Sequence, residues 1–219
     1  MNTIILILAR EGSVRLKNKN LKLINKKSLV RRTIEFAKKI APINKIILST
    51  DSKKIQKIGI KLGLNIPQKR PKKLAKNNTS SYETAIYEIK EYEKHNKKID
   101  IITLLQPTSP FRTLNNYKKI MKKFLKEKKI PLITVKKINL TSDKFFHAKK
   151  SKIFKIDSLK KSQDIYIPNG SYHIISKNRL IKEKSFYAKK MNFFLFKNIK
   201  ENIDIDTDED LKLAKNLIK

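Results

Sequence analysis

The chain has 219 residues, of which 39% are hydrophobic, so it can bury the core of a single domain. It contains no cysteine, which excludes disulfides and thiolate metal sites. Because no segment resembles a signal peptide or an apolar membrane span, we expect a cytoplasmic protein.

The net charge of +34 suggests a nucleic-acid ligand, but the composition argues against one. Only seven of the 53 basic residues are arginine, and the lysines are spread along the whole chain. A dedicated nucleic-acid binder would use more arginine, which forms bidentate contacts with bases and phosphates. The alternative of a basic binding protein without catalysis predicts tight DNA binding that weakens steeply with salt.

A buried strand followed by a basic loop opens the chain. Residues 4–8 are all apolar, which suits a buried strand and is too short for a membrane span. A parallel strand delivers its loop to the carboxyl edge of the sheet, where ligands of open α/β folds bind. This loop carries Arg10, Gly12, Ser13, Arg15, Lys17 and Lys19. A glycine, a hydroxyl and several cations suit a polyphosphate, although a basic loop can also be merely solvated.

Strands and helices alternate along the rest of the chain. Apolar residues at helical spacing predict helices over residues 29–40, 55–62, 82–89, 117–125 and 211–218. Apolar runs predict strands over residues 46–48, 99–105, 131–135 and 172–176. Capping-box spacing is present at Ser80 with Glu83 and at Thr207 with Asp210. This order predicts an α/β fold with a doubly wound, mainly parallel sheet.

We expect one domain over residues 1–219. Its periodicity weakens after residue 136, which indicates a small accessory or dimerisation subdomain at residues 136–176. Asn169 and Gly170 form a hairpin-type turn signal before the strand at residues 172–176.

Residues 203–206 alternate isoleucine and aspartate, as a strand with one buried face does. Asp204 and Asp206 would then point to the same side and could bind one or two Mg²⁺ ions, which suits phosphate chemistry. Acidic residues also stabilise the N-terminal end of a helix. That explanation is the preferred one for the acidic residues that follow, which are Asp208, Glu209 and Asp210.

Six motifs resemble those of the acylneuraminate cytidylyltransferases, or CMP-nonulosonate synthetases, in family order and over nearly the whole chain. They are AREGSVRLKNKN, STD, RPKKLAKNNTSS, LLQPTSPFR, PNGSYHI and IDIDTDEDLKLA. The resemblance implies a fold like that of nucleotide-diphospho-sugar transferases. It also implies a homodimer in which the subdomain reaches across to the partner. The implied reaction is Mg²⁺-dependent: CTP and a nonulosonic acid, a 2-keto sugar acid, give the CMP-sugar and pyrophosphate.

The resemblance implies roles for individual residues as well. The nucleotide would be bound by Arg10, Gly12, Ser13, Lys19, Asn20, Arg70 and Ser81. The sugar would be bound by Gln106, Lys144, Phe186 and Tyr187. Asp204 and Asp206 would bind Mg²⁺, and catalysis would use Arg10, Lys19 and Asp206, the last helping to deprotonate the attacking hydroxyl. For the two aromatic residues, the alternative is a place in the core.

Three positions depart from the family pattern. Lys17 replaces a proline, Asn77 replaces an acidic residue, and His173 replaces an aromatic phenol. The identity of the nonulosonic acid therefore stays open. Two further alternatives are a 3-deoxy-octulosonate cytidylyltransferase, against which LLQPTSPFR argues, and a degenerate homologue that binds CTP without activating a sugar.

Overall fold

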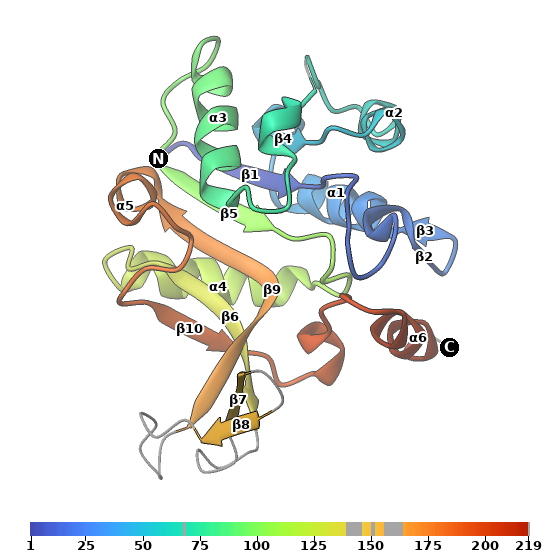
Figure 1. Ribbon diagram of the computed structural model, residues 1–219. Helices are drawn as coiled ribbons and strands as arrows, with labels where there is room; N and C mark the ends of the chain where they lie inside the picture. Colours follow the sequence, from blue (N-terminus) through green and yellow to red (C-terminus); the bar gives the residue numbers. More distant parts are fainter. Residues whose placement is uncertain (68, 139–145, 150–151, 156–163, 219) are drawn as a thin grey trace.

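The computed structural model describes residues 1–67, 69–138, 146–149, 152–155 and 164–218. A six-stranded sheet of order β10–β6–β9–β5–β1–β4 forms its centre (Figure 1). The strands are β1 (Thr3–Leu8), β4 (Ile46–Ser49), β5 (Ile101–Leu105), β6 (Leu132–Ile138), β9 (Ile165–Ser176) and β10 (Asn192–Leu195). β9 runs antiparallel to its two neighbours, and all other pairings are parallel. The predicted mainly parallel α/β sheet is confirmed.

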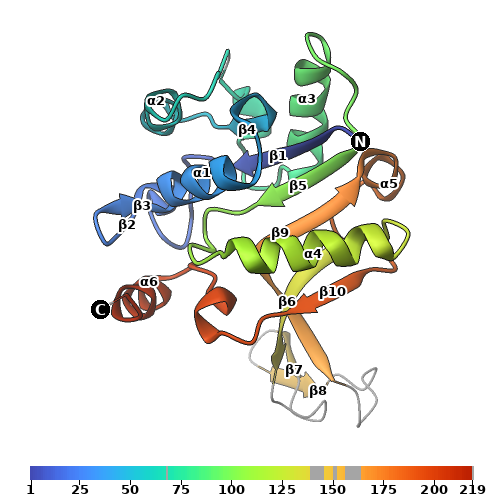
Figure 2. The same ribbon diagram turned by 180° about the vertical axis from the view of Figure 1, so that it is seen from behind.

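Helices cover both faces of the sheet (Figures 1 and 2). One face packs against α1 (Leu29–Ile40), α2 (Lys53–Lys61) and α4 (Leu114–Lys126), and the other against α3 (Ser81–Glu93) and α5 (Lys177–Glu183). In β1, Ile5 and Ile7 pack with α1, whereas Ile4 and Leu6 pack with α3. Because successive side chains of a strand alternate between faces, an all-apolar strand belongs between two helical layers.

A third apolar cluster brings the C-terminal helix α6 (Asp208–Asn216) to the carboxyl edge of the sheet. Leu211 and Ala214 of α6 pack with Leu16 of the basic loop and with Ile24. Ile24 belongs to a short ribbon of β2 (Leu23–Ile24) and β3 (Lys27–Ser28). Short 3₁₀ turns complete the fold at Lys19–Leu21, Ile43–Lys45, Lys72–Leu74 and Ile199–Asn202. No helix within the described ranges is long and apolar enough to span a membrane.

The predicted hairpin turn at Asn169 and Gly170 is wrong, because both residues lie inside the continuous strand β9. The register between β9 and β6 shifts between Ile133 and Val135, and Gly170 adopts the left-handed backbone with φ +72°. Asn169 is fully buried, and its Oδ1 accepts a hydrogen bond of 2.6 Å from Thr134 Oγ1. Burial of this amide inside the sheet overrides the local turn preference.

The strand predicted at residues 203–206 is also wrong, since this segment is extended but belongs to no strand. It is attached to the loop after β5 by Ile205 N, which donates to Thr108 O at 2.8 Å. The predicted alternation of buried and cavity-facing side chains is confirmed. Ile203 and Ile205 are buried, while Asp204 and Asp206 line a cavity.

A small antiparallel hairpin of β7 (Phe146–Lys149) and β8 (Lys152–Lys155), here called the arm, lies apart from the main sheet. It projects beyond the ends of β6 and β9 (Figure 1). The subdomain predicted at residues 136–176 thus contains the arm together with β9, which is part of the main sheet. Its role in dimerisation stays a prediction, and Lys144 lies outside the described residues.

Candidate active site

Three adjoining cavities lie where β1 and β5 reach the carboxyl edge of the sheet. The main cavity has a volume of about 540 Å³, and most of the predicted residues line it. They are Arg10, Ser13, Lys19, Asn20, Ser81, Gln106, Asp204 and Asp206. The arginine cavity, of about 130 Å³, contains Arg70, and the aromatic cavity, of about 170 Å³, contains Phe186 and Tyr187. Ser81 lines all three, so the cavities adjoin one another at the start of α3.

The basic loop after β1 is held by hydrogen bonds within the loop and to two other segments of the chain. Asn20 Nδ2 donates to Arg10 O at 2.8 Å, and Glu11 N donates to Asp51 Oδ1 at 2.9 Å. Arg10 Nη1 donates to Asn77 Oδ1 at 2.6 Å, so a neutral amide orients this cation. Gly12 does not line the cavity, and a Cβ built on it meets no atom within 4 Å. Gly12 is exposed, so its surroundings leave room for a side chain, and its predicted contact with the nucleotide stays a prediction.

Asp206 is bound by two cations of the basic loop. Lys19 Nζ lies 2.6 Å from Asp206 Oδ1, and Arg15 Nη1 lies 3.1 Å from Asp206 Oδ2. Arg15 is largely exposed, whereas Lys19 is mostly buried, so the Lys19 pair is the better defined of the two. These contacts join the N-terminal loop to the C-terminal segment across the main cavity.

Asp204 differs from Asp206 in how its carboxylate oxygens are paired. Its Oδ1 is buried and accepts no hydrogen bond from the described residues. Burial raises the pKa of Asp204, and the charge of Asp206 raises it further. A cation beside the two carboxylates would offset both effects.

The two aspartates fit Mg²⁺, which typically takes one or two carboxylates together with phosphate oxygens and water. No larger group of three or more histidine, cysteine, aspartate or glutamate side chains suited to a metal occurs among the described residues. The pair of Asp204 and Asp206, with the free Oδ1, is therefore the candidate metal site of this edge.

The wall beside Gln106 depends on two residues whose importance the sequence did not reveal. Gly170 faces Gln106, and a Cβ there would lie 2.5 Å from Gln106 Oε1. Arg112 donates from Nη2 to Gln106 O at 2.6 Å and from Nε to Ser171 O at 2.9 Å. Burial lowers the pKa of Arg112 to about 10, so it remains a cation and braces this loop.

The aromatic cavity combines a core residue and a surface residue. Phe186 is 3% exposed and belongs to the core, whereas Tyr187 is 52% exposed. The His173 ring makes edge contacts with both rings, and its Nε2 lies 3.3 Å from Tyr187 Oη. Burial lowers the pKa of His173 to about 4, so its imidazole is neutral near pH 7. The core alternative thus applies to Phe186, and Tyr187 supplies the accessible part of the predicted pair.

The arginine cavity has a charged residue in its wall. Arg70 is 6% exposed and lines the cavity with Arg10, Ser80 and Ser81. Burial lowers the pKa of Arg70, and the nearby charge of Asp51 opposes that shift. Ser80 begins α3 with the predicted capping box, which places Ser81 at the mouth of the cavity.

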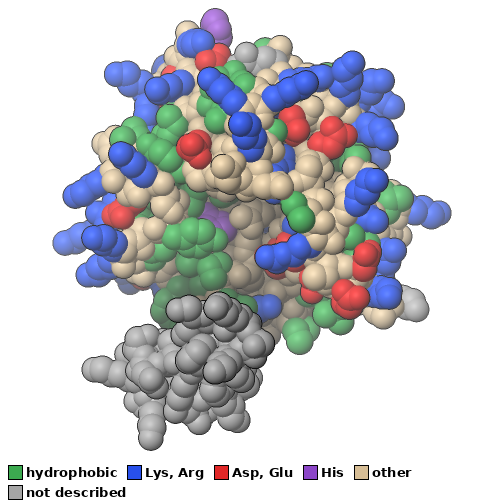
Figure 3. All heavy atoms as spheres, viewed as in Figure 1, with side chains coloured by type: hydrophobic (Ala, Val, Ile, Leu, Met, Phe, Trp, Pro, Cys, Tyr) green, Lys and Arg blue, Asp and Glu red, His purple; other side chains and the backbone are tan. Residues whose placement is uncertain are grey.

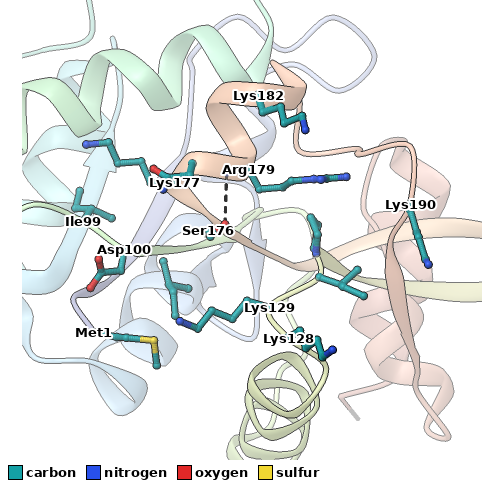
Figure 4. A pocket seen from close by; sticks show the side chains of 14 residues that line it. Met1, Ile99, Asp100, Lys128, Lys129, Ser176, Lys177, Arg179, Lys182 and Lys190 are labelled. Atoms are coloured by element: carbon teal, nitrogen blue, oxygen red, sulfur yellow. Dashed lines mark hydrogen bonds between the residues drawn. The ribbon is translucent and has the colours of Figure 1, made fainter.

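A larger cavity of about 660 Å³ lies at the opposite edge of the sheet and contains none of the predicted residues. Lys128, Lys129, Lys182 and Lys190 line it (Figure 4). Asp100, which also lines it, accepts a hydrogen bond from the Asn2 backbone. Lysine and arginine side chains are scattered over the face seen in Figure 3, among hydrophobic and other residues, and do not gather in one patch. The aspartate pair therefore distinguishes the site at the carboxyl edge.

Comparison with known proteins identifies the family of the chain. A profile of the family described as Cytidylyltransferase matches residues 4–219. The CMP-N,N'-diacetyllegionaminic acid synthase of Legionella pneumophila is 31% identical over 229 residues, which cover 100% of this chain and 97% of that protein. The N-acylneuraminate cytidylyltransferase of Escherichia coli is 37% identical over 109 residues, covering 50% of this chain and 25% of that protein.

Solved structures show the same fold. A CMP:2-keto-3-deoxy-manno-octonic acid synthetase complexed with CTP matches with a TM-score of 0.67 at 13% identity, covering 100% of this chain and 98% of that one. At such low identity this likeness concerns the fold alone. The family profile and the full-length Legionella relative carry the assignment: the chain belongs to the cytidylyltransferase family of enzymes.

Proposed function

We propose that this enzyme transfers CMP from CTP to a nonulosonic acid, releasing pyrophosphate. One observation carries the proposal: a cation-rich loop and a pair of aspartates face each other across one cavity, through the contact of Lys19 with Asp206. The full-length similarity to a CMP-N,N'-diacetyllegionaminic acid synthase supports the choice of sugar class.

The nucleotide is proposed to lie along the main and arginine cavities. Arg10, Ser13 and Lys19 bind the triphosphate, because cations and a hydroxyl on one loop match its oxygens. Asn20, Arg70 and Ser81 bind the cytidine. Gly12 lets the backbone approach the phosphates, which is consistent with the open space around it.

Asp204 and Asp206 are proposed to hold Mg²⁺, which when bound would neutralise charge on the phosphates of CTP. The anomeric hydroxyl oxygen of the sugar forms a bond to the α-phosphorus, and the bond from that phosphorus to the bridging oxygen breaks to release pyrophosphate. The hydroxyl proton passes to a carboxylate oxygen of Asp206. Lys19 and Arg15, which contact Asp206 in the free enzyme, then bind phosphate oxygens instead. There they stabilise the negative charge that develops on the departing pyrophosphate.

The sugar is proposed to lie against Gln106 and the aromatic cavity. Tyr187 is accessible there, while buried Phe186 shapes the wall from behind. A 3-deoxy-octulosonate substrate is the alternative, and only a likeness of fold favours it. A homologue that binds CTP without turnover is the other alternative.

A homodimer and a cytoplasmic location are further parts of the proposal. The arm offers a projecting element with which a partner chain could pair. Light scattering at micromolar concentration tests the dimer, and a monomer would contradict it. The cytoplasmic location stays a prediction from the sequence.

The test is pyrophosphate release from CTP and Mg²⁺ with a panel of N-acetylneuraminic, legionaminic, pseudaminic and 3-deoxy-octulosonic acids. We expect release with a nonulosonic acid and its loss, by at least about 10³-fold, in Asp206→Asn. Asp208→Asn is the matched control, because Asp208 is an exposed carboxylate of the same segment outside the cavity. Full activity in Asp206→Asn would refute the proposed role of that residue.

A further inference from the structure

A chain of buried hydrogen bonds lies behind the arginine cavity. Ser49, at the end of β4, is 1% exposed and contacts Arg70 on one side and Glu88 on the other. Arg70 Nε donates to Ser49 Oγ at 2.8 Å, and Arg70 Nη2 donates to Ser49 O at 2.7 Å. Ser49 Oγ in turn donates to Glu88 Oε1 at 2.5 Å.

This network fixes the direction of the Arg70 guanidinium. A serine hydroxyl has one hydrogen, and here Glu88 receives it, so the Ser49 oxygen must accept from Arg70 Nε. The Nη1 hydrogens of Arg70 have no acceptor among the described residues, and Arg70 lines the arginine cavity. They are therefore available to a ligand.

The charges around Arg70 also favour this position of its guanidinium. A buried guanidinium is unfavourable unless a carboxylate lies near it, and Glu88 and Asp51 both act on Arg70. Glu88 comes from α3, whose first residue, Ser81, lines the same cavity. The two residues are seven positions apart, about two helical turns, so one rigid helix carries both the cavity wall and the brace behind it.

We propose that Glu88 is a positioning residue for nucleotide recognition, which acts through Ser49 to hold Arg70 against the nucleotide. The inference rests on the proposed function, in which Arg70 binds the cytidine. Glu88 itself does not line the arginine cavity and is not expected to touch the ligand.

The test is a double-mutant cycle read by calorimetric CTP binding and by the KM for CTP. Glu88→Ala should weaken CTP binding about tenfold, since it removes a hydrogen bond to a charged group, and should leave kcat within about twofold. Glu88→Gln keeps an acceptor for Ser49 and should restore most of the affinity. Glu91→Gln is the matched control on α3, since Glu91 makes an ion pair with Lys94 outside the cavity.

The decisive comparison uses the Arg70→Ala background, and Arg70→Lys replaces it if the alanine variant does not fold. If Glu88 acts through Arg70, Glu88→Ala should have no further effect on CTP binding in that background. Equal, additive losses in both backgrounds would overturn the proposal, as would a wild-type protein that does not bind CTP. CTP binding without pyrophosphate release would refute the proposed function and leave the positioning role standing.

Discussion

Gly170→Ala tests the packing of the sugar side of the cavity. The substitution places a Cβ 2.5 Å from Gln106 Oε1, 2.9 Å from Ser109 Oγ and 3.4 Å from Asp204 Oδ1. It also forces alanine into a backbone with φ +72°. The left-handed conformation costs about 1–2 kcal/mol, and overpacking costs about 1–3 kcal/mol. Since Gln106 can move partly aside, we expect the free energy of unfolding to fall by about 2–4 kcal/mol.

Urea unfolding of the unliganded enzyme measures this change, and thermal unfolding gives a second reading of roughly 2–4 °C per kcal/mol at this chain length. The displaced Gln106 should also raise the KM for the sugar acid. Gly12→Ala is the matched control, because its Cβ meets nothing within 4 Å and its backbone is not left-handed. It should leave the unfolding free energy within about 0.5 kcal/mol yet weaken CTP binding. An unchanged stability in Gly170→Ala would refute the reasoning.

Two further predictions concern pH and helix capping. The pKa of His173 is lowered from 6.5 to about 4 by burial, so the unfolded chain takes up this proton first as the pH falls. The unfolding free energy should therefore drop between pH 6.5 and 4 more steeply in the wild type than in His173→Phe, and parallel urea-midpoint profiles would contradict this. Thr207→Ala removes the oxygen that accepts from Asp210 N at 3.2 Å at the start of α6. This substitution should lower the free energy of unfolding, measured by thermal unfolding, by about 1 kcal/mol. An unchanged value would show that the helix cap does not contribute to stability.

The order of strands and helices could be predicted from the sequence, because apolar periodicity reports directly on burial. The uninterrupted apolar run of β1 signals a central strand, and the structure buries Ile4 to Ile7 on alternate faces. The direction of β9 could not be predicted in this way. It depends on its long pairing with β6 and β5, whereas the Asn169–Gly170 dipeptide signals a turn only locally.

Motifs at the ends of strands predict most residues of the candidate site, and the structure places these residues around one cavity. Glu88 could not, since a glutamate on a helix in a strongly charged chain looks like a solvated surface residue. Only the folded contact with Ser49 reveals it. The sequence around Gly170 likewise predicts only a turn, because the spacing of residues does not report its close approach to Gln106.

The strand β9 extends from the arm to the aromatic cavity. It begins at Ile165 beside the arm and carries His173 in the aromatic cavity, about 27 Å further along at the usual rise of a strand. β6 pairs with it along this length, except at the register shift between Ile133 and Val135. A partner chain bound to the arm would therefore contact the end of the same pair of strands that reaches the aromatic cavity. The register shift between these two strands lies beside Gly170, so the irregular part of the pairing is also the part that borders Gln106.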